Sequence, residues 1–509
     1  MKNSVFRGIT AFILWTSLFA IAYSQAPLYT SNQNQYFLHG LAEAGFGNLD
    51  RDWLANTLDP TPVFSAMVKL TYSTFQTKVW FYLYYALLMG VYLFSLYGIA
   101  EALFQLSLSR IAPLIFLSVE TLIHSAGLRF ALARLISTDD AYILEEGFAG
   151  QRILGPVFQP STFGVLLALS IWLFLRRKPN LAAITAALAA VVHPTYLLSA
   201  AALTLAYLLA VYRDTRRLKQ PLLIGLAALA VALPILVYVW SAFGGTTGEM
   251  ATQARHILVY YRIPHHALVS EWFDTSELFK LVVILVGMFL ARRSRILWAL
   301  LVPFGVALLL TLLQLLTHND ALALLFPWRV SIFLVPLAVA IILAYLVSRL
   351  SAWRSLQSPA RQRAISSACA ILVVLSVAVG AIRFTLDLQR QKLEPERRVQ
   401  SYIAVHQARG DVYLIPVKMQ DFRLVTGAPA YVDFKSIPYH DTDVLEWYRR
   451  LRLADEFYKT LDCQKLADLA SQEGITHAVL PASSLLNCPG AVETYRDTSY
   501  ALYWLSPPD

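Results

Sequence analysis

Residues 221–241 read PLLIGLAALAVALPILVYVWS, a run without a single charged side chain. As an α-helix rising about 1.5 Å per residue, such a run is about 31 Å long, which matches the hydrocarbon core of a bilayer. Arg216, Arg217 and Lys219 come just before it, as is typical of the cytoplasmic flank of a membrane-spanning helix. Of the 509 residues, 57% are hydrophobic and only 15% are charged. This composition excludes a soluble enzyme, a disordered scaffold and a disulfide-rich secreted module.

Further apolar runs along the first 386 residues bring the number of candidate membrane spans to about eleven. Two short runs meet at His193-Pro194, and a helix break is predicted there because proline removes a backbone donor and disfavours helical geometry in the residue before it. The predicted fold class is a multispan α-helical membrane protein over residues 1–386, followed by a C-terminal domain over residues 387–509. The runs lie near residues 6–24, 79–107, 111–127, 160–175, 181–193, 195–212, 221–241, 278–291, 296–316, 330–348 and 365–385.

The loops between these runs form two alternating sets with opposite charge. Because Lys and Arg are retained on the cytoplasmic side, the basic set predicts an inward N-terminus and an outward C-terminal domain. The net charge of +9 is then a topology signal and excludes a nucleic-acid partner. The inward set holds 17 Lys and Arg against one acid, Asp214, in residues 1–8, 108–110, 176–180, 213–220, 292–295 and 349–364. The outward set holds 8 basic and 13 acidic residues, in residues 25–78, 128–159, 242–277 and 317–328.

The N-terminal run has a second interpretation. Lys2 and Arg7, followed by an apolar stretch that ends near Ser24, also fit a cleaved secretory signal. The loop that follows, residues 25–78, faces outward in either case.

Residues 387–509 are predicted to form an extracytoplasmic α/β domain, since short apolar runs alternate with helical patterns there. No glycine-rich nucleotide motif and no GxSxG motif occurs in this region. It contains Cys463 and Cys488, between which an oxidising compartment would permit a disulfide. The expected strands are 411–416, 422–426, 429–434, 475–481 and 500–506, and the expected helices are 441–459 and 463–473.

The first outward loop, residues 25–78, is long and rich in polar and aromatic side chains. Residues 36–44 have helical spacing and are expected to lie along the membrane interface. Asp50 and Asp52 follow, next to Trp53. A carboxylate in such surroundings can have a raised pKa and act as a general base. The alternative is that both are solvated loop residues or helix caps.

Taken together, the long first outward loop, the many-helix membrane body, the basic inward loops and the outward α/β domain resemble the GT-C superfamily of polyprenyl-phosphate-dependent glycosyltransferases. In that family the loop opens with an acidic pair and a Tyr three residues on. An amphipathic helix and a Gly-Asp-Trp-like segment follow. In this chain Asn32-Gln33 and Tyr36 occupy the first positions, residues 39–44 the helix, and Arg51-Asp52-Trp53 the later segment.

The resemblance implies that a sugar moves from a polyprenyl-phosphate donor to an acceptor at the outer face of the membrane. Asn32 and Gln33 replace the family's acidic pair and cannot take a proton. An active enzyme would therefore take its base from Asp52 or, failing that, from Asp50, while Asn32, Gln33 and Tyr36 bind the substrate. In a silent protein, Asn32 and Gln33 would only hydrogen-bond a sugar or a lipid head group.

Arginines and histidines in the other outward segments are candidate ligands of the donor phosphate, because Arg binds phosphate through a planar fork and His is a simpler donor. All ten histidines fall in predicted outward segments or at outward helix ends. The alternative for each candidate is anchoring to lipid head groups or an ion pair with a loop acid. The candidates are Arg152, Arg262, His265, His266 and Arg329.

No metal site is assigned, since the adjacent His265 and His266 have no third ligand with recognisable spacing. A divalent cation that bridges a carboxylate and the lipid phosphate fits the chemistry, although no motif requires it. Glu120 and His124 lie four residues apart on one face of a span, where such a pair either lines a cavity or pairs with its neighbours.

The sequence therefore predicts a membrane-bound glycosyltransferase of the cell envelope that uses a polyprenyl-phosphate-linked sugar. Its acceptor is an unidentified glycan, lipid or protein. The short inward loops favour a bacterial cytoplasmic membrane, with the active face outside. One alternative is a lipid or sugar transporter or flippase, against which stands the missing internal repeat. The other is a catalytically silent glycan- or lipid-binding protein on the same scaffold.

Overall fold

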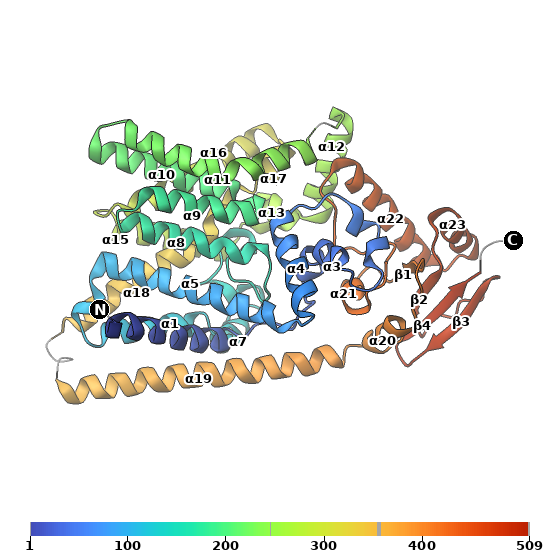
Figure 1. Cartoon of the computed structure of the whole chain (residues 1–509), viewed down its shortest axis with the longest axis horizontal. Helices are drawn as coiled ribbons and strands as arrows, with labels where there is room; N and C mark the ends of the chain where they lie inside the picture. Colours follow the sequence, from blue (N-terminus) through green and yellow to red (C-terminus); the bar gives the residue numbers. More distant parts are fainter. Residues whose placement is uncertain (1, 245, 354–357, 507–509) are drawn as a thin grey trace. The chain divides into compact units, whose positions relative to one another are not determined.

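The computed structural model describes residues 2–244, 246–353 and 358–506 (Figure 1). The chain divides into two compact units. The helical unit comprises residues 1–25, 81–238 and 259–385, and the mixed unit comprises residues 26–80, 239–258 and 386–509. The first outward loop of the sequence thus belongs to the same unit as the C-terminal region.

The helical unit is built from the apolar runs of the sequence. Its longer helices are α1 (Lys2–Tyr23), α5 (Val79–Phe104), α6 (Ala112–Ile123), α7 (Ala126–Leu135), α8 (Val165–Leu175), α9 (Pro179–Val192), α10 (Leu197–Thr215), α11 (Lys219–Phe243), α15 (Thr275–Leu290), α16 (Ile296–Thr317), α18 (Ser331–Ser351) and α19 (Pro359–Lys392). Its short helices are η3 (Leu106–Leu108), η4 (Asp139–Tyr142), η5 (Phe148–Gly150), η6 (Pro160–Gly164), η7 (Pro194–Tyr196), η8 (Ile257–Arg262), α13 (Pro264–Ala267), α14 (Val269–Trp272), α17 (Asp320–Leu324) and η9 (Pro327–Val330). The ends of α5, α11, α19 and η8 continue into the mixed unit.

Six helices in the described part of the chain are long and apolar enough to cross a membrane, and the bent pair α6–α7 would make a seventh. All eleven apolar runs of the sequence fall on helices, so their helical character is confirmed. Several of them, such as α8 and α9, are shorter than a full bilayer span. The number of about eleven spans and the N-in/C-out orientation therefore stay predictions.

Two breaks interrupt these helices. The predicted break at His193-Pro194 is confirmed: α9 ends at Val192, and His193 has the extended angles φ −135° and ψ 98°. The second break, between α6 and α7, bends the chain by 55°. There the Ser125 hydroxyl accepts a hydrogen bond from the backbone N–H of Leu128 at 3.1 Å, which caps α7.

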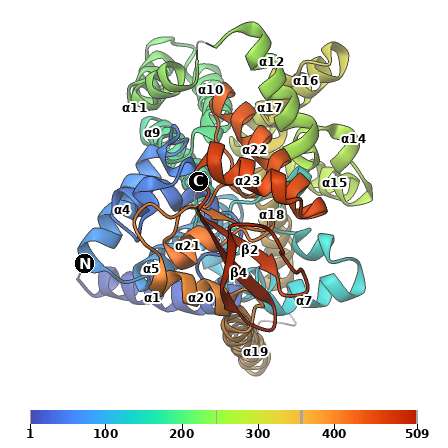
Figure 2. The same ribbon diagram turned by 90° about the vertical axis from the view of Figure 1, so that its right-hand side faces the viewer.

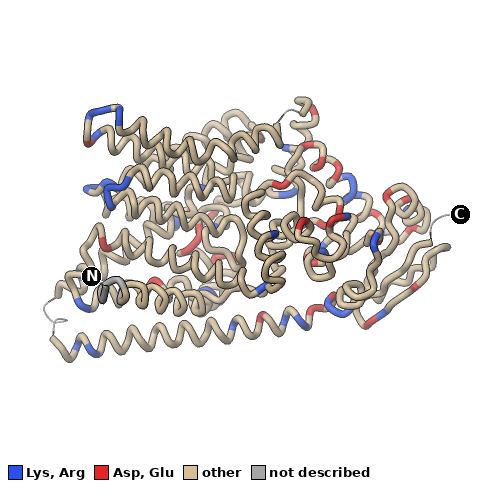
Figure 3. The backbone as a smooth tube through the Cα atoms, viewed as in Figure 1, with Lys and Arg blue, Asp and Glu red and all other residues tan. Residues whose placement is uncertain are grey.

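The basic loops meet at one end of the helical unit. Figure 3 shows Lys and Arg gathered where α10 turns into α11. Asp214, at that turn, lies 3.4 Å from Arg177 of the α8–α9 turn and 2.9 Å from Arg295 of the α15–α16 turn. Three of the loops that the charge pattern assigned to one face therefore lie side by side.

The mixed unit combines the first outward loop with a small sheet. Its helices are α2 (Gln33–Tyr36), α3 (Leu38–Glu43), η1 (Leu49–Arg51), η2 (Leu54–Asn56), α4 (Pro62–Phe75), α12 (Gly248–His256), α20 (Arg397–His406), α21 (Phe422–Thr426), α22 (Asp441–Thr460) and α23 (Cys463–Glu473). Its strands are β1 (Tyr413–Leu414), β2 (His477–Pro481), β3 (Ala491–Arg496) and β4 (Tyr500–Leu505), in the order β1-β2-β4-β3. β1 runs parallel to β2, and the other pairs are antiparallel.

The sheet lies between two helical layers (Figure 2). Because successive strand residues point to opposite faces of a sheet, neighbouring residues of one strand pack against different layers. Ala478 and Leu480 of β2 belong to a core with Trp447 of α22. Val479, between them, belongs to a second core with Val399 of α20. The expected α/β character of the C-terminal region is thus present.

Two expected strands of the mixed unit differ from the structure, and one observed strand was not expected. Residues 422–426 form the one-turn helix α21, which ends at Gly427 with φ 72°, where glycine is favoured. Residues 429–434 contribute only an isolated bridge, between Tyr413 and Ala430. Strand β3 was not predicted, because its face is mostly exposed and it has no apolar run. The helix expected over residues 36–44 is observed as the end of α2 and as α3, of which residues 38–42 are buried, and its position at the membrane interface stays a prediction.

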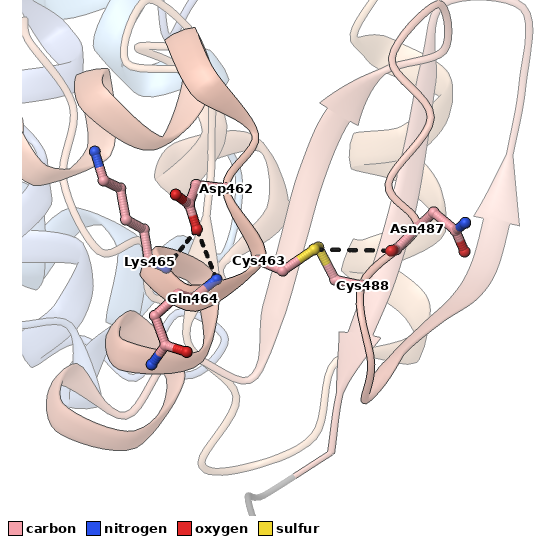
Figure 4. The surroundings of a disulfide bond; sticks show 6 residues. All are labelled: Asp462, Cys463, Gln464, Lys465, Asn487 and Cys488. Carbon is pink, nitrogen blue, oxygen red and sulfur yellow. Dashed lines mark hydrogen bonds between the residues drawn. A yellow bond between two sulfur atoms is a disulfide. The ribbon is translucent and has the colours of Figure 1, made fainter.

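Cys463 and Cys488 form a disulfide that joins α23 to the segment before β3 (Figure 4). Next to it, the Asp462 carboxylate caps α23 by accepting the backbone N–H groups of Gln464 at 2.7 Å and Lys465 at 3.3 Å. The bond closes a loop with a sequence separation of 25 residues.

Replacing Cys463 and Cys488 with serine is expected to lower the stability of the mixed unit by about 3 kcal/mol, because the unfolded chain regains the freedom that the loop closure removes. Thermal unfolding of the purified full-length protein measures the effect. A reducing agent should destabilise the wild type and leave the double variant unchanged. Equal sensitivity of both proteins to the reductant would contradict the prediction.

Candidate functional site

The connection between α7 and α8, residues 136–164, is anchored to the helical unit by hydrogen bonds to its backbone. Tyrosine hydroxyls hold its backbone: Tyr23 donates to the carbonyl of Leu154 at 2.7 Å, and Tyr196 donates to that of Ser161 at 2.6 Å. A long connection with few elements of its own is thus anchored to α1 and η7. Such a rigid loop can carry functional side chains in fixed positions.

Buried ion pairs join this connection to α15. Lys280 is 1% exposed, and its ammonium lies 2.9 Å from the Glu146 carboxylate and 3.2 Å from that of Glu277. Glu145, the residue before Glu146, is paired with Arg129 of α7 at 3.4 Å. These charges are compensated, as burial requires, and they fix the loop rather than offering an open ligand site.

Arg329 of η9 differs from these neighbours because its described partners are neutral. Its Nη1 donates to the amide oxygen of Gln151 at 3.1 Å, and its Nη2 lies 3.1 Å from the hydroxyl of Thr195 and 3.3 Å from the ring of His193. Among the described residues no carboxylate lies within ion-pair distance of it, and its buried Nε has no hydrogen-bond partner. A half-buried guanidinium in this state is a ready site for an anion.

Two further donor groups lie in the segments that carry Arg329 and its partner Gln151. Trp328 is 8% exposed, and its buried indole N–H has no partner among the described residues. Arg152 follows Gln151 in the chain, stacks on the ring of Tyr142 at 3.8 Å and keeps 26% of its side chain exposed. Its contact with Glu146, at 3.9 Å, is loose. Trp328 precedes Arg329 in the chain and Arg152 follows its partner Gln151, so both donors belong to the segments that carry this contact. We call Gln151, Arg152, Thr195, Trp328 and Arg329 the anion site.

The other predicted phosphate ligands of the helical unit have separate positions. His266 is half-buried and its Nδ1 lies 2.8 Å from the carbonyl oxygen of Ala149. His265 is exposed, with its ring 4.2 Å from that of His266. Arg262 is half-buried at the end of η8. No group of three or more His, Cys, Asp or Glu in the described chain has the arrangement of a metal site.

Asp52, the first candidate for the base, lies in the mixed unit and is 0% exposed. Its Oδ1 accepts the backbone N–H groups of Leu54 at 2.9 Å and Ala55 at 3.2 Å. Its Oδ2 accepts the N–H of Ala430 at 2.9 Å and the Nε of Arg423 at 2.6 Å. The carboxylate is therefore not an accessible group next to Trp53, and the structure corrects that part of the expectation. Four donors leave it no free lone pair for a substrate proton.

Arg423 continues this buried network. Its Nη1 donates to the Asp433 carboxylate and its Nη2 to the carbonyl of Ala430 at 2.8 Å. Arg423 is 3% exposed and Asp433 is 1% exposed. Burial raises the pKa of Asp433, and the Arg423 charge opposes that rise. We call Asp52, Arg423 and Asp433 the buried triad.

The remaining candidates of the first loop also lie in the mixed unit. Asp50 keeps 48% of its side chain exposed and lies 3.4 Å from Arg409. Gln33 is buried, and its amide oxygen accepts the backbone N–H of Tyr29 at 2.7 Å. Asn32 and Tyr36 are half-buried on either side of it. The predicted site residues are thus divided between the two units.

The pair of Glu120 and His124 is wholly buried in the helical unit. The Nδ1 of His124 lies 3.7 Å from the Glu120 carboxylate, and its Nε2 lies 3.1 Å from the hydroxyl of Tyr92. The His124 Nδ1 is hydrogen-bonded to the backbone carbonyl of Glu120 at 3.0 Å, whereas neither oxygen of the Glu120 carboxylate has a hydrogen-bond partner among the described residues, so these contacts do not decide between pairing and cavity lining.

Sequence reasoning missed the charges that hold the site together: Glu145, Glu146, Glu277 and Lys280. One signal was available, since Glu145-Glu146 is an acidic pair in an outward loop. Its basic partner Lys280 lies 134 residues away from Glu146, inside an apolar run.

Glu145 gives a testable pH dependence. Burial raises its pKa to about 7 and outweighs the attraction of Arg129 and Arg152. A carboxyl with its ordinary pKa of about 4.3 in the unfolded chain then binds its proton more tightly when folded. Stability from this group is present below pH ~4.3 and is lost as the pH rises to about 7.

We therefore expect Glu145→Gln to flatten the fall of the melting temperature between pH ~5 and pH ~7. Thermal unfolding of the detergent-solubilised protein across this range measures it. The exposed Glu43→Gln serves as the control, and a slope in Glu145→Gln equal to that of the wild type would contradict the prediction.

Comparisons with known proteins give three findings. Residues 394–454 match DUF6798, a domain of unknown function. No curated protein matches the chain. The chain is also similar to a solved structure, that of ArnT from Cupriavidus metallidurans bound to undecaprenyl phosphate. It is 13% identical, and the alignment covers 99% of this chain and 98% of that chain, with a TM-score of 0.47.

Proposed function

We propose that this protein is an integral membrane glycosyltransferase that takes its sugar from a polyprenyl-phosphate donor. The observation that carries the proposal is Arg329, a half-buried cation with only neutral described partners. Burying a charge without a counter-charge costs free energy, and a bound anion would lower that cost. A lipid phosphate supplies that anion where the protein meets the membrane.

The chemistry of transfer explains why a cation is needed. The acceptor hydroxyl attacks the anomeric carbon, the bond from that carbon to the phosphate oxygen breaks, and the phosphate leaves with the electron pair. Arg329 and Arg152 would stabilise the negative charge that develops on this leaving group. A fork of N–H donors suits the two oxygens of a phosphate.

A carboxylate must accept the proton of the acceptor hydroxyl. Asp50, half exposed with ion-pair distances of 3.7 Å to Arg51 and 3.4 Å to Arg409, has the accessibility that this role requires, and Asp52 lacks it. We therefore favour Asp50 as the base. Asn32, Gln33 and Tyr36 are proposed to contact the sugar.

A divalent cation that bridges a carboxylate and the phosphate is the alternative to stabilisation by arginine alone. Transfer that persists in EDTA and falls in Arg329→Ala favours the arginines. Transfer that stops in EDTA and returns with Mg²⁺ favours the cation.

The proposed location is a bacterial cytoplasmic membrane, with the C-terminal region outside. The basic loops at one end of the helical unit support this orientation. The disulfide between Cys463 and Cys488 also supports it, because such bonds persist in oxidising compartments. The acceptor would be a glycan, lipid or protein on that side.

Proteoliposomes that contain the purified protein and a labelled undecaprenyl-phosphate-linked sugar test the proposal. Transfer of the label to a cell-envelope acceptor fraction is expected. Movement of the label across the bilayer without transfer would support a flippase instead.

The second candidate function is a catalytically silent binding protein. Two observations favour it: Asn32-Gln33 replaces an acidic pair, and Asp52 is sealed in the buried triad. Binding of undecaprenyl phosphate that depends on Arg329, without transfer to any acceptor fraction, would establish this alternative.

A further inference from the structure

The turn over residues 147–151 has an unusual backbone. Ala149 has φ 57° and ψ 34°, a left-handed conformation in which non-glycine residues are uncommon. Gly150 follows with φ 63°. A hydrogen bond from the Gly147 N–H to the Gln151 carbonyl closes the turn at 2.8 Å. A strained residue of this kind persists only where its surroundings hold it.

Two side chains hold Ala149 itself. The Oε1 of Glu277 accepts its backbone N–H at 3.1 Å, and the Nδ1 of His266 lies 2.8 Å from its carbonyl oxygen. Since a carbonyl oxygen only accepts, His266 must carry its proton on Nδ1 in this contact. Both polar groups of the strained residue are therefore bound by side chains from other helices.

Two more side chains hold the residues before it. Lys280 donates to the carbonyl of Gly147 at 3.2 Å, and the Ser331 hydroxyl accepts the N–H of Phe148 at 2.7 Å. Phe148 also packs on Trp328 with ring centroids 4.5 Å apart. The turn is thus fixed by contacts from α15 and α18 as well as from α13.

The turn leads directly to the anion site. Its last residue, Gln151, accepts the hydrogen bond from Arg329 at 3.1 Å, and Arg152 is the next residue. A rotation of the backbone at Ala149 would move both side chains. Orienting Arg329 therefore depends on a conformation that the turn would not keep by itself.

We infer that His266 and Glu277 are positioning residues of the anion site, which hold Ala149 in its left-handed conformation and so place Gln151 against Arg329. This inference rests on the proposed function for its ligand. It gives His266 a different role from the direct phosphate contact for which the sequence made it a candidate, because His266 acts through the backbone of the turn.

The His266 series tests the role with undecaprenyl phosphate as the probe. His266→Ala is expected to weaken binding by about tenfold, the typical effect of one lost hydrogen bond. His266→Asn should restore binding, because the amide nitrogen of asparagine lies where Nδ1 lies in histidine. His266→Gln should not, because its nitrogen lies one bond further out. A direct phosphate contact by Nε2 predicts the reverse order.

A second substitution, Ala149→Gly, distinguishes a loss of the Ala149 backbone conformation from a general loss of folding. Glycine adopts the left-handed conformation without strain, so Ala149→Gly should recover part of the binding lost in His266→Ala and Glu277→Ala. Ala149→Gly alone should bind normally. Glu277→Gln keeps an acceptor for the Ala149 N–H and should lose less binding than Glu277→Ala.

Hydrogen exchange of the peptide over residues 147–152 gives a readout that needs no ligand. Faster exchange is expected in His266→Ala and Glu277→Ala, with wild-type exchange in His266→Asn. Unchanged exchange in both alanine variants would overturn the inference, as would normal binding by both while Arg329→Ala loses it. A wild-type protein that does not bind undecaprenyl phosphate would overturn the proposed function and, with it, the positioning role.

Discussion

Arg329→Ala is expected to weaken the binding of undecaprenyl phosphate by about 10- to 100-fold and to remove most transfer. A hydrogen bond to a charged group contributes about 1.5–3 kcal/mol, and the variant loses a charge as well as the fork of donors. The folded protein should tolerate the change, since the described partners of Arg329 are neutral and no buried carboxylate is left without its cation. Binding to the protein in nanodiscs measures the loss.

Arg329→Lys and Arg217→Ala sharpen this experiment. Lysine keeps the charge but lacks the planar fork, so Arg329→Lys should retain part of the binding. Arg217 is exposed in the loop between α10 and α11, and its loss should leave binding unchanged. If Arg329→Ala binds as the wild type does, the anion site is not the ligand site.

Arg423→Ala is expected to destabilise the mixed unit by about 3–5 kcal/mol, the usual effect of breaking a buried ion pair from one side. The variant leaves the Asp52 and Asp433 carboxylates at 0% and 1% exposure without their cation. Limited proteolysis and thermal unfolding of the full-length protein measure the loss.

Asp52→Asn and Asp50→Asn form a matched pair of carboxylate variants. Asp52→Asn removes one charge of the buried triad and should lower the melting temperature along with any activity. Asp50→Asn affects only exposed ion pairs, which contribute about 0–1 kcal/mol, so its melting temperature should be close to that of the wild type. A stable but inactive Asp52→Asn protein would return Asp52 to the role of base.

The helical part of the fold followed from local sequence. Apolar runs such as 221–241 predict helices by themselves, and the chemistry of proline located the break after Val192. The sheet was harder to predict, because β3 has an exposed face and α21 has the composition of a strand. Local propensity cannot decide such short segments, since their partners lie elsewhere in the chain.

The candidate site was predictable as a list of residues but not as an arrangement. Arg329 was a candidate because it is an arginine in a predicted outward segment, and arginine binds phosphate through a planar fork. Asp52 was misread as accessible because its cation, Arg423, lies 371 residues away in a segment with no distinguishing motif. Partners this distant are brought together only by the tertiary fold.

The sequence separation of Asp52 and Arg423 also sets the order in which the buried triad can form during synthesis. The first extramembrane segment leaves the ribosome long before Arg423 is made, so the Asp52 carboxylate remains without its cation during the synthesis of the next 371 residues. Deleting the last ninety or so residues should therefore strand the N-terminal loop in an immature form that quality-control proteases recognise, although every helix ahead of the deletion would still be translated.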